Sequence, residues 1–330
     1  MKVSPSTVSR ALKGHNSISQ EKIKAITKLA KKRNYIPNDL AANLRQNKSN
    51  RIGVIINWID RKFHSSLVCG VEEEVSNKGM NVVITQAHDR YKDEVENAKA
   101  LINSRVSGLI VSLAMETMDY DHYEPYFRNQ IPVVFADRVP PPKFKCHRVI
   151  IDNAHAAQVA TSHLIDQGCH RIVLISGNSN RENYRERIQG YLQAHKERSL
   201  KVDKNLIYEA DTKSEEEAIM ALREYMSSPH QPDAIFCTSD TMAVAILQYC
   251  KKVGIKVPDQ LAVMGFNNDP ITSIIEPNLT TTLNPAFEIG RHAAKLILDQ
   301  QKMKWTSKDF KTIYLETELI VRESTMRKKL

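Results

Sequence analysis

The chain has 330 residues, of which 42% are hydrophobic, so it is long enough for two or three domains with buried cores, and its formal net charge is +9. No uncharged apolar run approaches the ~18 residues of a membrane span, and no apolar segment follows Lys2, so we expect neither a membrane protein nor a secreted one. The five cysteines are scattered without a C-x-x-C pair, which predicts reduced thiols and a cytoplasmic location.

The positive charge is confined to the first fifty residues. They contain eleven Lys and Arg but only two Asp and Glu, so this excess of nine accounts for the whole net charge of the chain. A basic module ahead of a neutral body is the electrostatic footprint of a nucleic-acid-binding protein. A membrane-surface arm is the competing interpretation, but the segment lacks the bulky apolar face that such an arm needs.

The first expected helix follows Ser4, a good N-cap, and ends before Gly14, a permissive C-cap. Pro5 suits the first helical position, and Val8 and Leu12 lie four apart on one apolar face. The other positions carry short hydroxyls and one guanidinium, which suit phosphates and the edge of guanine in a major groove. These residues are Ser6, Thr7, Ser9 and Arg10. An ordinary surface helix is the alternative interpretation.

Two more helices are expected in the basic module. One begins at the N-cap Ser19 and continues to Lys32, with apolar residues at helical spacing. The other is short, residues 39–45, and cannot hold a helix alone in water. Leu40 and Leu44 lie on one face of it with the small Ala41 beside them. Either this face packs against a body or a partner chain, or the helix forms on DNA and an apolar wedge enters the minor groove.

From Arg51 onward, buried strands alternate with helices. The expected strands are 52–56, 82–85, 109–111, 133–135, 149–151, 172–175, 234–237, 261–265 and 312–319, and the expected helices include 66–78, 92–102, 154–167, 183–196 and 287–298. This alternation is typical of a doubly wound parallel sheet in an α/β protein, and its restart near residue 149 predicts two such subdomains with a cleft between them. Ligands bind beyond the carboxyl ends of such strands.

We expect the last helix and strand, residues 287–298 and 312–319, to cross back and complete both sheets. We also expect three regions in the chain. Residues 1–50 would form the head-piece and hinge helix, residues 51–152 with 285–311 an N-terminal subdomain, and residues 153–284 with 312–330 a C-terminal subdomain.

The sequence offers no catalytic machinery. Its eleven glycines are too dispersed for a phosphate-binding loop or a nucleophile elbow, and its histidines show no H-E-x-x-H spacing. Polar residues do follow several strands, as at Asp137-Arg138, Ser239-Asp240 and Asn267-Asn268-Asp269. We therefore predict a binding protein that is not an enzyme, with no catalytic residues, no cofactor and no metal.

The motifs Val3-Ser4, Thr7 to Leu12, Tyr35-Ile36-Pro37-Asn38 and Ala41 to Leu44, ahead of a two-part α/β body, resemble the lac repressor (LacI/GalR) family of bacterial transcription regulators. The resemblance covers essentially the whole chain. It implies that the first helix is the recognition helix of a helix-turn-helix, whose own first helix would lie upstream of Val3 and is missing here. It also implies DNA contacts from Ser4, Pro5, Ser6, Thr7, Ser9, Arg10 and Asn38, with Ala41 and the wedge Leu44 in a hinge helix.

The resemblance further implies a body like periplasmic sugar-binding proteins, with a small effector in its cleft. The implied effector-binding residues are Phe63, His64, Ser65, Ser112, Asp137, Asn183, Arg187, Ser239, Asn267 and Asn284. Arg187 opens Arg187-Ile188-Gln189-Gly190-Tyr191, where the family has its effector arginine; an inter-lobe ion pair is the alternative role. Sugar-binding members often have Asp at the position of Asn267, which leaves the effector open between neutral sugars, sugar acids and sugar phosphates.

These features predict a homodimeric transcriptional regulator, most simply a repressor, that reads a pseudo-palindromic operator and responds to a sugar or a sugar derivative. Its partners would be double-stranded operator DNA, the effector and a second copy of the chain, and no membrane. The alternative is a cytoplasmic sugar-binding protein that does not bind DNA because its head-piece is truncated.

Overall fold

The computed structural model describes residues 3–12, 14–33, 35, 50–211, 214–302 and 310–327. The chain divides into two compact units, Met1–Ser49 and Asn50–Leu330, which we call the head-piece and the body. The expected hinge-helix residues Asn38, Ala41 and Leu44 lie outside the described residues, so their roles stay predictions.

The head-piece contains α1 (Pro5–Leu12) and α2 (Gln20–Lys32), which pack against each other. Ser4 caps α1, because its Oγ accepts a hydrogen bond from the backbone N–H of Thr7 at 3.3 Å. Gly14 has a φ of +66° and ends the helix with paired bonds, its own N–H to Ala11 O and the N–H of His15 to Arg10 O, each at 3.0 Å. The predicted caps of this helix are therefore confirmed.

The start of α2 differs in detail from the expectation. Ser19 stands at the N-cap of α2, but its side chain makes no capping hydrogen bond. On the expected apolar stripe, Ile26 is buried whereas Leu29 is 38% exposed. Within its described residues, the head-piece thus buries little apolar surface.

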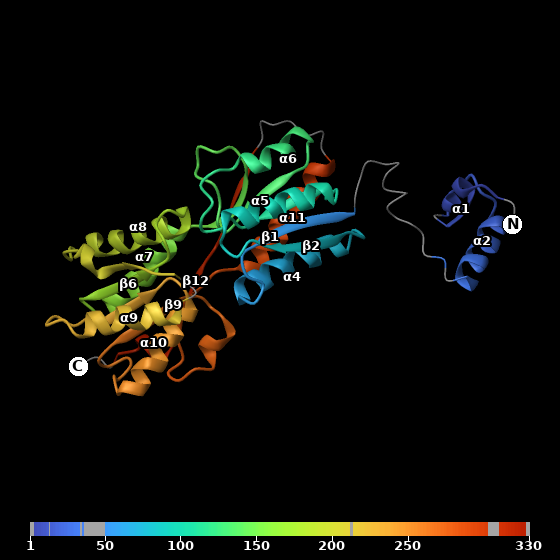
Figure 1. Cartoon of the computed structure of the whole chain (residues 1–330). Coiled ribbons are helices and arrows are strands. Elements are labelled where there is room, and N and C mark those ends of the chain that lie inside the picture. The colour runs from blue at the N-terminus through green and yellow to red at the C-terminus, as the bar shows by residue number, and fades with distance from the viewer. Residues whose placement is uncertain are drawn as a thin grey trace. The chain divides into compact units, whose positions relative to one another are not determined.

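The body is built on two six-stranded sheets, each with helices on both faces (Figure 1). The first sheet has the order β11-β5-β4-β3-β1-β2 and the second β12-β10-β9-β8-β6-β7. All neighbouring strands are parallel except β10 and β12, which are antiparallel. The predicted pair of doubly wound α/β subdomains is confirmed, and we call them the first and second lobes.

The first lobe takes its elements from both ends of the body. Its strands are β1 (Arg51–Ile56), β2 (Asn81–Gln86), β3 (Gly108–Val111), β4 (Val133–Ala136), β5 (His147–Ile151) and β11 (Thr312–Leu315). Its helices are α4 (Lys62–Ser76), α5 (Tyr91–Asn103), the short η1 (Asp121–Tyr123) and α6 (Glu124–Arg128), and α11 (Ala286–Lys302). The chain returns to this lobe through α11, which packs on α4.

The second lobe repeats this arrangement. Its strands are β6 (Ile172–Ser176), β7 (Ile207–Glu209), β8 (Ala234–Cys237), β9 (Ala262–Asn267), β10 (Thr280–Leu283) and β12 (Glu318–Ile320). Its helices are α7 (Asn153–Asp166), α8 (Glu182–Glu197), α9 (Glu215–Met226) and α10 (Asp240–Val253), with the short turns η2 (Lys204–Leu206), η3 (Pro270–Ser273) and η4 (Glu323–Thr325).

The expectation that the end of the chain crosses back to complete both sheets is confirmed, but the expected single strand over residues 312–319 is two strands. β11 pairs with β5 in the first sheet, so residues 312–315 do not belong to the second subdomain, and β12 pairs with β10 in the second sheet. The chain therefore changes lobes at Glu316-Thr317, after leaving the first lobe at β5 and the second at β10. Three crossings connect the lobes, and the other proposed region boundaries remain predictions.

Candidate effector cavity and DNA-facing helix

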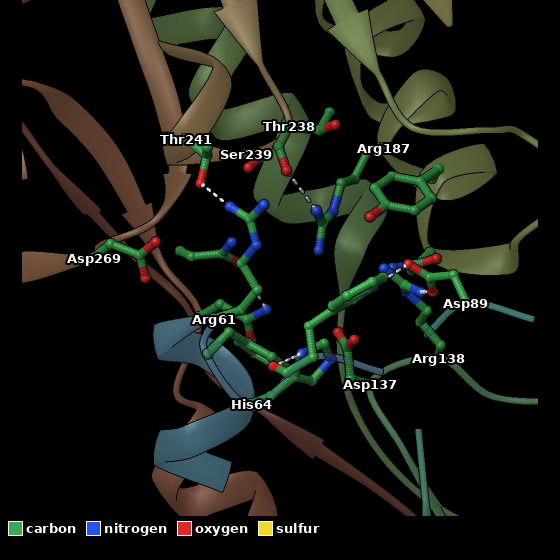
Figure 2. A pocket seen from close by; sticks show the side chains of 16 residues that line it. Arg61, His64, Asp89, Asp137, Arg138, Arg187, Thr238, Ser239, Thr241 and Asp269 are labelled. Carbon is green, nitrogen blue, oxygen red and sulfur yellow. Dashed lines mark hydrogen bonds and ion pairs between the residues drawn. The ribbon is translucent and has the colours of Figure 1, made fainter. Parts of the chain in front are cut away.

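A cavity of about 80 Å³ lies where the carboxyl ends of the two sheets face each other (Figure 2). The first lobe contributes side chains that follow β1, β2 and β4, and the second lobe contributes residues of α8 and residues that follow β8, β9 and β10. The lining residues are Trp58, Arg61, Phe63, His64, Asp89, Asp137, Arg138, Asn183, Tyr184, Arg187, Thr238, Ser239, Thr241, Asn267, Asp269 and Asn284. This is where a doubly wound fold places its ligands.

Eight of the ten predicted effector residues line this cavity: Phe63, His64, Asp137, Asn183, Arg187, Ser239, Asn267 and Asn284. Ser65 and Ser112 are not among the lining residues. The Ser65 hydroxyl turns back along α4 and donates to Lys62 O at 3.1 Å, and Ser112 is buried at the end of β3 with 1% exposure.

Eight further lining residues were not in the predicted effector set, although two of them, Arg138 and Asp269, belong to polar runs that the sequence already indicated. The eight are Trp58, Arg61, Asp89, Arg138, Tyr184, Thr238, Thr241 and Asp269. Arg138 and Asp269 stand inside polar runs that directly follow strands. Trp58 and Asp89 follow β1 and β2, so the same rule about strand ends would have found them.

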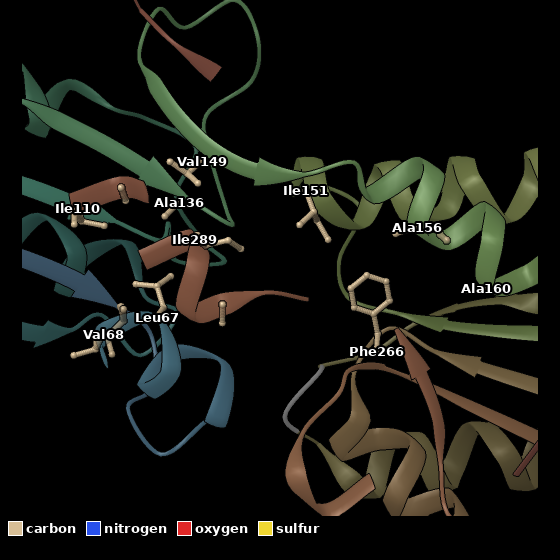
Figure 3. Packing of buried hydrophobic residues seen from close by; sticks show 14 of the residues in the cluster. Leu67, Val68, Ile110, Ala136, Val149, Ile151, Ala156, Ala160, Phe266 and Ile289 are labelled. Carbon is tan, nitrogen blue, oxygen red and sulfur yellow. The ribbon is translucent and has the colours of Figure 1, made fainter. Parts of the chain in front are cut away.

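Arg187 is held in place from three directions. Its Nε donates to Asn153 Oδ1 at 3.0 Å and its Nη1 to Thr238 O at 3.1 Å, and its guanidinium carbon lies 3.8 Å from the centroid of the Phe266 ring. Phe266 belongs to a buried apolar cluster that has members in both lobes (Figure 3). The guanidinium is thereby fixed in the cavity wall, with its burial lowering the pKa of Arg187.

Gly190, one turn after Arg187, explains why a glycine belongs in this motif. A Cβ at Gly190 would lie 2.0 Å from Ala154 O of α7, so only glycine lets α8 approach α7 this closely. The close crossing sets Arg187 beside Asn153 at the start of α7.

Asp89 organises the first-lobe side of the cavity. Its carboxylate receives Arg138 Nη1 at 2.5 Å and Trp58 Nε1 at 3.0 Å, and its own backbone lies in the left-handed region with φ +62°. His64 is buried with its Nδ1 3.1 Å from Trp58 O, and burial lowers the pKa of His64 to about 4. The imidazole is therefore neutral at neutral pH.

Arg61 bridges the two lobes at the cavity. It stands at the N-cap of α4 and its Nη1 donates to Thr241 Oγ1 of α10 at 3.1 Å. A second bridge lies outside the cavity, where Arg181 Nη2 of the second lobe donates to Thr117 O of the first. The lobes are thus held together by polar contacts as well as by the covalent crossings.

The chemical groups of the lining indicate what kind of ligand the cavity suits. Among the residues that the structure describes, no group of His, Cys, Asp and Glu could hold a metal ion, and no helix is long and apolar enough to cross a membrane. The cavity instead presents guanidinium groups, carboxylates, amides and aromatic faces, a mixture suited to orienting a small polar ligand.

In the head-piece, α1 presents its predicted DNA-facing residues on the surface. Pro5 and Arg10 are exposed, and the Ser4 hydroxyl lies 2.8 Å from Ser6 Oγ and 2.9 Å from Thr7 Oγ1. Ser6, Thr7 and Ser9 are half-buried. The hydroxyls therefore gather at the N-terminus of the helix, where free N–H groups favour a phosphate.

Known proteins resemble both units. Residues 1–38 match a family described as bacterial regulatory proteins, lacI family, and residues 161–325 match the periplasmic binding protein-like domain. The HTH-type transcriptional repressor CytR of Escherichia coli (strain K12) is 33% identical over 98% of this chain and 93% of its own length. The HTH-type transcriptional repressor PurR of Photobacterium profundum is 28% identical over 98% and 95%. A solved transcriptional regulator CelR-cellobiose complex is 26% identical, with a TM-score of 0.75 over 98% of this chain and 96% of that chain.

Proposed function

Because the chain belongs to the lacI family of bacterial regulatory proteins, we propose that its head-piece recognises an operator through α1 and that a small effector in the cavity controls this binding. The family consists of transcriptional regulators with an effector-binding core, so the predictions of a regulator and of a protein that is not an enzyme are confirmed. Repression is the mode of action named for the relatives CytR and PurR.

The cavity is the observation that carries the proposal for the body. Both lobes line it, so an effector that touches both would favour one arrangement of the lobes over another. A difference in effector affinity between two arrangements is what allostery requires. The three crossings between the sheets, at β5, β10 and Glu316-Thr317, are the segments that would bend.

For the head-piece, we assign base contacts to Pro5, Ser6 and Arg10, and phosphate contacts to Ser4, Thr7 and Ser9. The exposed Arg10 can reach the O6 and N7 atoms of guanine. Asn38, Ala41 and Leu44 keep their proposed roles at the backbone and in the minor groove. The protein would act as a homodimer on a pseudo-palindromic site in the cytoplasm, where its DNA lies. Nothing in the comparisons favours the alternative of a sugar-binding protein without DNA binding.

The test is selection of binding sites from a library of random DNA duplexes, with the wild-type chain and with Arg10→Ala. The wild type is expected to enrich a pseudo-palindrome. Arg10→Ala should lose the preference at one base pair in each half-site, at a cost of about 1–3 kcal/mol. Lys252→Ala, which removes an exposed cation from the body, is the matched control and should leave the selected sequence unchanged. Failure of the wild type to enrich any sequence, or an Arg10→Ala selection identical to it, would contradict the proposal.

A further inference from the structure

The cavity carries a balanced set of charges. Its lining includes three arginines, Arg61, Arg138 and Arg187, and three aspartates, Asp89, Asp137 and Asp269, while His64 is neutral at neutral pH. A site built for a phosphate or a carboxylate brings an excess of positive charge to its ligand. The formal charge of this lining is zero, so the cavity does not supply such an excess.

Each of the three arginines is also engaged within the protein. Arg138 is paired with the carboxylate of Asp89, and both side chains are largely buried. Arg187 uses two of its nitrogens on Asn153 and Thr238, and Arg61 donates to Thr241. Each arginine therefore uses part of its donor capacity on the wall of the cavity and does not present its whole guanidinium to a ligand.

The lining also includes hydrogen-bond acceptors that lack partners within the protein. Among the described residues, the Asp269 carboxylate accepts no hydrogen bond, and the Asp137 carboxylate receives only an amide, that of Asn284. Asn183 Oδ1 and Asn284 Oδ1 are buried without a hydrogen-bond partner. Buried acceptors without partners cost about 1–3 kcal/mol each, and a ligand that donates hydrogen bonds removes that cost.

Asp269 supplies a carboxylate near the end of β9. Asn267, the last residue of that strand, is an amide and cannot carry the negative charge of a carboxylate. Asp269 lines the same cavity two residues further on, and its backbone N–H donates to the buried Asp240 at 2.8 Å. This bond anchors the backbone that carries the Asp269 carboxylate.

We propose that the cavity selects an uncharged ligand rich in hydroxyl groups, and that Asp137 and Asp269 exclude sugar phosphates and sugar acids. The hydroxyls would donate to these carboxylates and to Asn183 and Asn284, with the free side of the Arg187 guanidinium donating to a ligand oxygen. Trp58, Phe63 and Tyr184 supply apolar faces for the ring of the ligand. This inference rests on the proposed function, because it names the class of effector for the same site.

The test is a binding assay on the full chain with matched pairs of compounds. Aldopentoses, aldohexoses, cellobiose and ribonucleosides are each compared with their phosphate ester or, for the aldoses, their aldonate, by thermal shift and then calorimetry. At least one uncharged compound is expected to bind, with its charged counterpart bound about tenfold more weakly or worse, since like charges repel at short range. A charged member that binds more tightly than its uncharged counterpart would overturn the proposal, and so would a panel in which no uncharged compound binds.

Two isosteric variants test the role of the carboxylates. Asp137→Asn and Asp269→Asn should each weaken binding of the uncharged ligand by about tenfold. Each should also reduce the ratio of the affinity for the uncharged ligand to the affinity for its charged counterpart. Asp259→Asn, which removes an exposed carboxylate that does not line the cavity, should change neither quantity. Equal losses for both members of a pair would show a purely structural role and overturn the exclusion of anions. Selection of DNA sites with the same protein preparation shows whether the proposed function fails or only the assignment of the effector class, because it tests operator recognition without any effector.

Discussion

The head-piece and the body differ in how much apolar surface they bury and in their net charge. Within its described residues the head-piece buries mainly Ala11 and Ile26, and it carries the whole positive excess of the chain in its first fifty residues. The body has no net charge, and its sheets are lined by fully buried side chains such as Phe236. In the proposed function, DNA would be read by the charge of the head-piece and the hydroxyl groups of α1, whereas a ligand would be positioned by side chains held on a buried core.

The largest expected effect is on the stability of the body. Phe236→Ala in β8 empties a fully buried position and should lower the free energy of unfolding of the body by about 3–5 kcal/mol. Urea unfolding followed by circular dichroism measures it. Met220→Ala, at a position 62% exposed, is the control and should stay within about 0.5 kcal/mol. A loss below about 1 kcal/mol for Phe236→Ala would mean that the core does not specify the body.

The next prediction is that salt weakens DNA binding by the head-piece far more than ligand binding by the body. Raising the salt from about 50 mM to about 200 mM should weaken operator binding by about a thousandfold, because cations of the head-piece replace counterions on phosphates. Binding of an uncharged ligand in the neutral cavity should change by less than about twofold. Fluorescence anisotropy for DNA and calorimetry for the ligand measure both quantities. Equal salt dependence of the two would remove the distinction between the units.

A smaller expected effect is the pH dependence of the stability of the body that comes from Asp240. Asp240 is fully buried at the start of α10, where it accepts bonds from Asp269 N at 2.8 Å and Thr281 Oγ1 at 2.7 Å. Burial raises the pKa of Asp240 from 3.8 to about 7, so between these pH values the folded state holds a proton that the unfolded state releases. This group therefore makes the body less stable as the pH rises from about 4 to about 7.

Asp240→Asn removes this contribution. The difference in the free energy of unfolding between the wild type and Asp240→Asn should change across that pH window and level off above it, as measured by urea unfolding at each pH. The comparison with the variant is needed because other buried groups also change the stability of the wild type over this pH range. His64, whose pKa is lowered by burial, makes the body more stable as the pH rises. The exposed Asp259→Asn serves as the control. Parallel stability curves for the wild type and Asp240→Asn would contradict the assignment.

Periodicity predicted most of the fold because the strands of parallel sheets are continuous apolar runs. It missed β10, whose sequence is Thr-Thr-Thr-Leu, although Thr280 and Thr281 are fully buried. Their hydroxyls are satisfied locally, as where Thr280 Oγ1 donates to Arg322 O at 2.9 Å, so the strand is polar in sequence and buried in structure. Periodicity also merged β11 and β12 into one expected strand, since it does not reveal the break at Glu316-Thr317 where the chain passes from one sheet to the other.

The cavity was predictable where a residue directly follows a strand or lies in a family motif, as Asp137 and Arg187 do. It was not predictable where the chain geometry alone brings a side chain in. Arg61 does so by spanning to Thr241 of the other lobe, and Tyr184 lines the cavity from within α8. Tertiary geometry decides these positions, and no pattern of neighbouring residues encodes it.

The central claim is that the cavity and the head-piece are coupled, and one measurement tests it most directly. Operator affinity is measured with and without the tightest uncharged ligand, and ligand affinity with and without operator. We predict that the ligand and the operator each change the other's affinity by the same factor, about 5- to 150-fold. Arg187→Met should weaken binding of the ligand, so that a ligand concentration which saturates the wild type no longer changes the operator affinity of the variant. Operator affinity that stays the same at saturating ligand would contradict the account.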